Sequence, residues 1–232
     1  MPKISVVIPF YNCPYIQYAI ESLISQIEKD YEIIVVDDGS TCYAELLDPY
    51  EKYIRYFKKE NGGTATALNE GIKQAKGEYF TWLSSDDLYL PAKLSKQVQH
   101  MESEQADICY TSANIIGQTN KERQNLFFHQ FNNYQDFLMK LSRRCIIHGN
   151  SVMMKMDVFS NIGVFNEEYR YTHDYEMWLR AALHYHFYHI PEALVQYRIH
   201  EGMGTNKYKE DIVHELKKLR RKYIGRFDNG II

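Results

Sequence analysis

The fold is decided by the stretch EIIVVDDGS at residues 32–40, in which an apolar run stops abruptly at two aspartates. An earlier stretch, ISVVI at residues 4–8, has the same character. Both are apolar at successive positions, which is typical of parallel strands buried on both faces of a sheet. Between them, apolar residues within 14–27 recur at helical spacing. This order predicts a β-α-β unit.

The same alternation continues to about residue 113. We expect further strands at 53–58, 79–83 and 107–113, a helix between Gly63 and Gly77, and a helix at 91–103. Strands that alternate with helices build an open, mostly parallel sheet flanked by helices. The sequence therefore predicts an α/β fold.

The second half of the chain is less regular, and the change comes near residue 115. We expect helices at 133–142, 174–185 and 209–223, and strands at 151–155 and 188–197. Pro191 interrupts the last strand, and it predicts an edge position because proline cannot donate a hydrogen bond to a sheet. A length of 232 residues fits a single domain.

Composition excludes several classes of protein. The net charge of −3 leaves no basic excess, so we expect no nucleic-acid partner. No run approaches the ~20 apolar residues that a membrane span needs. The four cysteines are widely spaced without a C-x-x-C pair, which fits reduced thiols in a cytoplasmic protein. The sequence does not determine the oligomeric state.

A basic stretch, KKLRRKYI at residues 217–224, stands out near the C-terminus. Clustered lysines and arginines on a helix can rest on an anionic membrane surface, which allows a peripheral contact at the inner face of the membrane. The alternative is an ordinary solvated surface helix.

Polar turns follow each of the first four predicted strands, at 9–12, 37–40, 61–63 and 84–87. The carboxyl ends of parallel strands meet at one edge, so we expect these turns to face one crevice. Two acidic pairs there repel each other unless a cation or hydrogen-bond donors intervene. Mg²⁺ or Mn²⁺ bridging a diphosphate fits this need. The alternative for each acidic pair is a solvated turn.

Two weaker signals accompany the acidic pairs. Asn61, Gly62 and Gly63 could bring backbone N–H groups to a phosphate at a helix start, or form a plain turn. Asp174 stands at the start of a helix with an apolar stripe, where an acid is also favoured by the helix dipole alone. The histidines show no spacing typical of a hydrolase.

Taken in order, these motifs resemble those of the family-2 glycosyltransferases, over about residues 3–200. The resemblance is carried by SVVIPFYN at 5–12, IVVDDGS at 34–40, NGG at 61–63, NEGI at 69–72, GEY at 77–79, SSDD at 84–87, Pro91, KL at 93–94, GVFNE at 163–167, the segment 173–180 and YRIH at 197–200. It implies a Rossmann-like GT-A fold with a nucleotide-binding half (about 1–114), an irregular acceptor-binding half (about 115–205) and a C-terminal helix (about 206–232).

The resemblance also implies an activity and a set of roles. The activity is inverting transfer of a sugar from a nucleotide-sugar donor, such as a UDP-sugar, to a saccharide or lipid-linked acceptor in cell-surface polysaccharide synthesis. The implied roles are a base pocket of Pro9, Tyr11 and Asp38, with Asp38 accepting the N3–H of a uracil-like base, a ribose contact at Asp86, a Mn²⁺ or Mg²⁺ ligand at Asp87, and a catalytic base at Asp174. His200 is a further candidate for the metal or a phosphate, or else an ordinary strand-end histidine.

Three positions depart from the family pattern. His173 stands where the family usually has Glu, Ser85 stands at the first position of the D-x-D-type element, and Leu68 lies where Arg is frequent. The departures at His173 and Ser85 keep open a nucleotide-sugar-binding protein without activity. A nucleotidyltransferase, which also uses an α/β sheet and acidic metal ligands, is a further alternative with less support, because no Gly-rich basic signature lies near the N-terminus.

Overall fold

The computed structural model describes residues 1–126, 131–223 and 225–227. The strands are β1 (Ile4–Phe10), β2 (Tyr31–Asp37), β3 (Ile54–Lys58), β4 (Tyr79–Trp82), β5 (Leu88–Tyr89), β6 (Ile108–Ile116), β7 (Glu122–Leu126), β8 (Val152–Lys155) and β9 (Phe187–Arg198). The α-helices are α1 (Ile16–Ile24), α2 (Thr64–Gln74), α3 (Lys93–Ser103), α4 (Tyr134–Arg143), α5 (Met156–Ile162), α6 (His173–Ala181), α7 (Gly204–Lys207) and α8 (Lys209–Tyr223), and the 3₁₀ helices are η1 (Ala44–Tyr53) and η2 (Gly149–Ser151).

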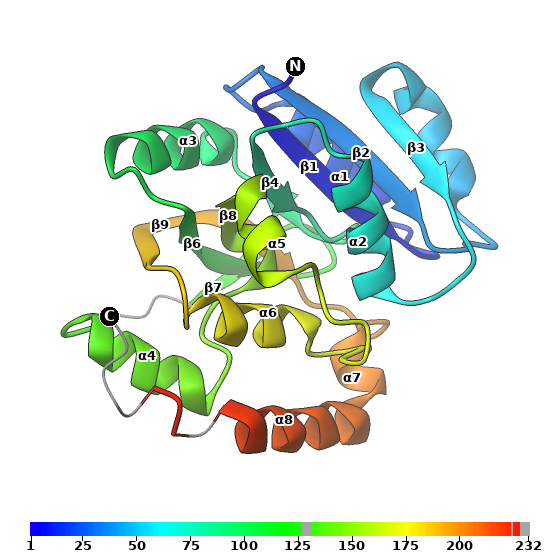
Figure 1. The fold of residues 1–232 in the computed structure, drawn as a ribbon. Coiled ribbons are helices and arrows are strands. Elements are labelled where there is room, and N and C mark those ends of the chain that lie inside the picture. Colours follow the sequence, from blue (N-terminus) through cyan, green and yellow to red (C-terminus); the bar gives the residue numbers. More distant parts are fainter. Residues whose placement is uncertain (127–130, 224, 228–232) are drawn as a thin grey trace.

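One sheet runs through the molecule in the strand order β3-β2-β1-β4-β8-β6-β9-β5, with β7 paired to β6. Its first four strands are parallel, as predicted (Figure 1). Phe10 at the end of β1 pairs with Asp37 at the end of β2, and Val7 pairs with Trp82 at the end of β4. The loops that follow these strands therefore open at the same edge of the sheet.

Antiparallel pairs enter where β8 lies between β4 and β6. β6 is parallel to β9, and the short β5 is antiparallel to β9. The predicted α/β class is confirmed, with a mixed sheet in which the parallel order is interrupted by β8.

The edge position predicted from Pro191 is wrong for part of β9, because β5 pairs with that strand at Val195 and Gln196. Pro191 lies where the register against β6 shifts, between Ile190 and Ala193. The ladder skips Pro191 and its neighbour there, so the missing N–H of proline breaks no strand pairing.

Successive residues of the central strands enter two different cores. Val6 and Ile8 pack in a cluster with α1 and α3, whereas Val7 packs in a second cluster with α2. Helices α4, α5, α6 and α8 contribute to that second cluster, and Figure 1 shows α8 beside α6. Burial on both faces explains why the strands are apolar at successive positions.

Several short elements were not predicted: η1, η2, α5, α7, β5 and β7. Each is too short, or too irregular in its apolar spacing, to give a periodic signal. The predicted C-terminal helix is confirmed as α8, and Ile224, the last residue of the basic stretch, lies outside the described residues. Among the described helices, none has both the length and the apolar character needed to cross a bilayer.

Gly71 allows α2 to approach β1 closely. A Cβ atom at this position would lie 2.3 Å from Cγ1 and 3.1 Å from Cβ of Val7. Val7 is buried, and its branched side chain has little rotamer freedom, so the neighbour cannot move aside.

We expect Gly71→Ala to lower the free energy of unfolding by about 1–3 kcal/mol, because overpacking forces α2 away from the sheet. Alanine favours a helix over glycine by at most about 1 kcal/mol, which offsets only part of this loss. Urea denaturation measures the change. Lys73→Ala, on the exposed side of α2, is the control and should stay within about 0.5 kcal/mol of the wild type. An unchanged midpoint for Gly71→Ala would contradict the close contact.

Candidate active site

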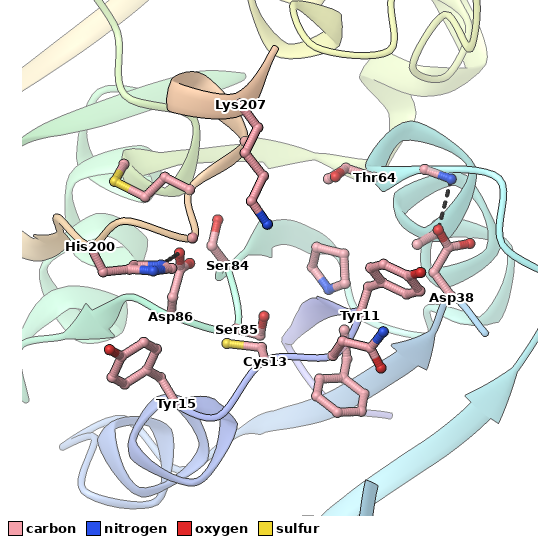
Figure 2. A pocket seen from close by; sticks show the side chains of 18 of the residues that line it. Tyr11, Cys13, Tyr15, Asp38, Thr64, Ser84, Ser85, Asp86, His200 and Lys207 are labelled. Carbon is pink, nitrogen blue, oxygen red and sulfur yellow. Dashed lines mark hydrogen bonds and ion pairs between the residues drawn. The ribbon is translucent and has the colours of Figure 1, made fainter. Parts of the chain in front are cut away.

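A cavity of about 850 Å³ opens at the carboxyl ends of β1, β2 and β4 (Figure 2). Much of the opposite wall comes from residues between 197 and 212, at the end of β9, in α7 and in the start of α8. Of the eight residues given a site role from the sequence, six line it: Pro9, Tyr11, Asp38, Gly63, Asp86 and His200. Asp87 and Asp174 lie outside this lining.

Asp38 is held by the loop that follows β3. One carboxylate oxygen accepts hydrogen bonds from Lys59 Nζ at 2.7 Å and Gly62 N at 3.0 Å. The other accepts from Gly63 N at 2.7 Å and Asn61 Nδ2 at 3.1 Å. The backbone N–H groups that the sequence offered to a phosphate are therefore directed at Asp38.

Groups of the protein stabilise the charged form of Asp37 in a similar way. Burial alone would raise its pKa, but hydrogen bonds from the Tyr56 hydroxyl and the Ser40 backbone, with Lys58 nearby, lower the pKa below its ordinary value. This pair of aspartates is thus tolerated because protein donors surround it.

Asp86 is the acid of the second pair that faces the cavity. Its Oδ2 lies 3.0 Å from Nε2 of His200, and Figure 2 shows the two side chains meeting at one end of the cavity. The ring of Tyr15 packs against His200, with the ring centroids 5.1 Å apart. These contacts bring the end of β9 to the loop after β4.

Asp87 points into the protein. The Asn150 side-chain amide donates to one oxygen, and the Arg198 backbone N–H donates to the other at 2.7 Å. Burial, with the charge of Asp86, raises the pKa of Asp87 well above its ordinary value. Arg198 is itself fully buried and donates to the Asp86 carbonyl at 2.7 Å, so it fixes the same loop. No motif pointed to Arg198 in this role.

Asp174 is half-buried in the first turn of α6. Its Oδ1 accepts a hydrogen bond from Tyr175 N at 2.7 Å, and burial raises its pKa. Gly149 lies beside it, since a Cβ there would be 3.3 Å from Asp174 Oδ2. The preceding residue, His173, lines the cavity.

Two cations of the lining were missed in the sequence. Lys207 reaches into the cavity from α7, as Figure 2 shows, and Arg170 lies over Gly63. Neither belongs to a periodic segment or a recognisable motif, so no local signal marked them. They add positive charge to a cavity that Asp86 makes acidic at one end.

A metal ion bound by protein groups alone does not fit this site, because the described residues contain no group of three His, Cys, Asp or Glu side chains arranged to hold one. Asp86 and His200 still offer two ligands on the cavity wall. Mg²⁺ and Mn²⁺ often take one or two protein ligands and complete their shell with water and phosphate oxygens. The pair therefore fits a metal that binds together with a diphosphate.

The sequence profile described as glycosyl transferase family 2 matches residues 5–163, more than half of the chain. The chain belongs to glycosyltransferase family 2. An uncharacterized glycosyltransferase of Rickettsia typhi is 38% identical in an alignment of 213 residues that covers 88% of this chain and 66% of that protein. This family-2 chain thus spans just under two thirds of that relative.

A second relative and a solved structure are also similar to this glycosyltransferase. The putative teichuronic acid biosynthesis glycosyltransferase TuaG of Bacillus subtilis is 29% identical, with 90% of this chain and 84% of TuaG aligned. The crystal structure of S. aureus TarS in complex with UDP-GlcNAc superposes with a TM-score of 0.75 at 22% identity, over 96% of this chain and 66% of that one. This likeness confirms the fold.

Glu215 of α8 holds the segment that leads this glycosyltransferase into α6. Its carboxylate accepts hydrogen bonds from the backbone N–H groups of Arg170 and Thr172, both at 2.9 Å, and from the Thr172 hydroxyl at 2.7 Å. Tyr171 N donates to it at 3.1 Å. Residues 170–172 precede the first residue of α6, so their N–H groups have no partner inside the helix. The terminal helix therefore satisfies them and fixes the residues before Asp174.

We expect Glu215→Ala to speed amide hydrogen exchange at residues 170–172, because their N–H groups lose a shared acceptor. Stability should fall by about 1–3 kcal/mol. Exchange followed by mass spectrometry and urea denaturation measure the two effects. Glu210→Ala, an exposed acid on the same helix, is the matched control. Unchanged exchange at 170–172 would show that Glu215 does not hold this segment.

Proposed function

We propose that this family-2 glycosyltransferase moves a sugar from a nucleotide-sugar donor to a hydroxyl of a saccharide or lipid-linked acceptor, with inversion and with a divalent metal. One observation carries the proposal: a single cavity gathers Asp38, the Asp86–His200 pair and the cation Lys207, and it adjoins the half-buried carboxylate of Asp174. A donor made of base, diphosphate and sugar needs partners of these kinds in one place.

The base of the donor is proposed to bind between Pro9, Tyr11 and Asp38. Tyr11 is 52% exposed, so its ring is available for stacking. Both oxygens of Asp38 already accept hydrogen bonds from the 59–63 loop, and the N3–H of uracil would share one of these oxygens. UDP as the nucleotide is supported by the TarS structures, which are described as complexes with UDP and UDP-GlcNAc.

The metal is proposed to bind at Asp86 and His200. Asp87, assigned this role from the sequence, is proposed instead to support the loop from behind, because its oxygens are taken by Asn150 and Arg198. When bound, Mn²⁺ or Mg²⁺ stabilises negative charge on the departing diphosphate. Lys207 contributes to the same stabilisation by binding phosphate oxygens.

Asp174 is proposed as the general base. It takes the proton of the acceptor hydroxyl while that oxygen forms a bond to the anomeric carbon. The bond from this carbon to the diphosphate oxygen breaks on the opposite face, which inverts the configuration. Burial raises the pKa of Asp174, so the carboxylate is a stronger base than an exposed aspartate.

The acceptor is proposed to belong to a cell-surface polysaccharide assembled at the cytoplasmic face of a membrane. The name of TuaG, which refers to teichuronic acid biosynthesis, supports this class. On α8, Lys217, Arg220 and Arg221 are exposed, and Lys218 and Lys222, which are exposed as well, form ion pairs within the chain. The first three provide charge for an anionic surface.

We expect Mn²⁺ to tighten the binding of UDP, and Asp86→Asn to weaken this metal-dependent binding at least about tenfold, because the metal loses a charged ligand. Isothermal titration with and without Mn²⁺ measures both. Asp157→Asn, an exposed acid of α5, should bind like the wild type. Loss of the metal response in Asp87→Asn but not in Asp86→Asn would return the metal to Asp87.

Asp174→Asn should reduce turnover of UDP-sugars about 10²- to 10⁴-fold, because no base removes the acceptor proton. UDP release from a panel of UDP-sugars and saccharide acceptors measures turnover, and UDP affinity should stay within about twofold of the wild type. Asp211→Asn is the control. Full turnover in Asp174→Asn would exclude Asp174 as the general base. A wild type that binds UDP but turns over no donor would support the binding protein without activity.

A further inference from the structure

Two neighbouring rings in the cavity wall carry polar atoms without partners. Trp82 at the end of β4 and His173 at the start of α6 line the cavity and are only 6% and 7% exposed. Within the described part of the chain, neither the indole Nε1 of Trp82 nor either ring nitrogen of His173 makes a hydrogen bond. The Arg170 carbonyl lies close to the His173 ring and favours its protonated form, but the contact does not have the geometry of a hydrogen bond. The two ring centroids are 6.2 Å apart.

This arrangement carries a cost in the empty cavity. A buried polar atom without a partner destabilises the folded state, and such atoms are rare in native proteins. Trp178 shows that the core tolerates one unpaired indole N–H away from the cavity. The three unpaired atoms of Trp82 and His173 differ, because they belong to rings that line the cavity: the atoms themselves are covered, and a ligand reaches them once the rings turn.

The hydrogen-bonding atoms of the two rings determine which kind of ligand group can bind to them. Burial lowers the pKa of His173, so the ring is neutral, with one nitrogen donating and the other accepting. Trp82 can only donate. A partner for both must donate and accept, as a hydroxyl does, whereas a phosphate oxygen only accepts. Since no hydrogen bond fixes the imidazole, a half-turn of the ring can bring nitrogen in place of carbon toward the cavity.

The two rings also stand beside the proposed base. A Cβ at Gly149 would lie 2.4 Å from Cζ2 of Trp82 and 3.3 Å from Oδ2 of Asp174, so both side chains lie against the backbone of Gly149. A base must lie within hydrogen-bond reach of the hydroxyl that attacks the anomeric carbon. The sugar of the donor therefore lies next to Trp82.

We propose that Trp82 and His173 form a subsite for the hydroxyls of the donor sugar and help to determine which sugar is accepted. This inference rests on the proposed function, because it requires a nucleotide-sugar in the cavity. Acceptor hydroxyls have the same chemistry, so binding of the donor in the absence of any acceptor distinguishes the two sources.

The test compares UDP with UDP-GlcNAc, UDP-glucose and UDP-galactose by isothermal titration in the presence of Mn²⁺. Trp82→Phe and His173→Phe keep an aromatic ring and remove the polar atoms. For the UDP-sugar that the wild type binds best, each variant should raise Kd about three- to tenfold, the value of one lost hydrogen bond. Kd for UDP should change less than about twofold, and His173→Gln, which keeps a donor and an acceptor, should retain most of the affinity.

Trp178→Phe is the matched control, since it removes the unpaired indole N–H that lies outside the cavity. It should leave both affinities unchanged. Far-UV circular dichroism shows which variants fold, and the His173 pair decides the outcome should Trp82→Phe unfold. Equal changes of Kd for UDP and for the UDP-sugar, or no change for either, overturn the subsite alone. A wild type that binds no UDP overturns the proposed function, and this inference with it.

Discussion

The shape of the cavity depends on how the chain neutralises Asp38. Its carboxylate sits at a crowded sheet edge, and four donors from the loop at 59–63 surround it. Satisfying this buried charge draws the loop across the end of β2 and sets where α2 begins. The carboxylates at this edge of the sheet therefore bind first to hydrogen-bond donors of the chain itself. Of the four aspartates at the strand ends, Asp38 and Asp86 line the cavity, and only Asp86 among them meets His200.

The two halves of the molecule meet at this cavity through polar contacts across long distances in sequence. Arg198 holds the loop of Asp86 from β9, and Glu215 holds the segment before Asp174 from α8. Each contact satisfies backbone groups that would otherwise lack partners. The irregular half thus fixes the loop of the proposed metal ligand in the regular half, and within itself it fixes the segment before the proposed base.

The first half of the fold could be predicted because periodic apolar residues are a local signal. The rule that ligands bind at carboxyl strand ends also placed Pro9, Tyr11 and Asp38 on the cavity. Which of Asp86 and Asp87 faces the cavity could not be predicted, since the answer depends on Asn150 and on β9, far along the chain. Arg170 and Lys207 escaped notice because they lie outside periodic segments, and the bulge at Pro191 because it needs a neighbouring strand to be defined.

One feature of the cavity bears on how such enzymes diverge. The family profile ends at residue 163, yet much of the wall facing the strand ends is built from residues between 170 and 212. Sequence changes in this part can reshape one side of the cavity while the loops after β1, β2 and β4 stay as they are. Related enzymes can in this way keep the same strand-end loops for the nucleotide and come to glycosylate different acceptors.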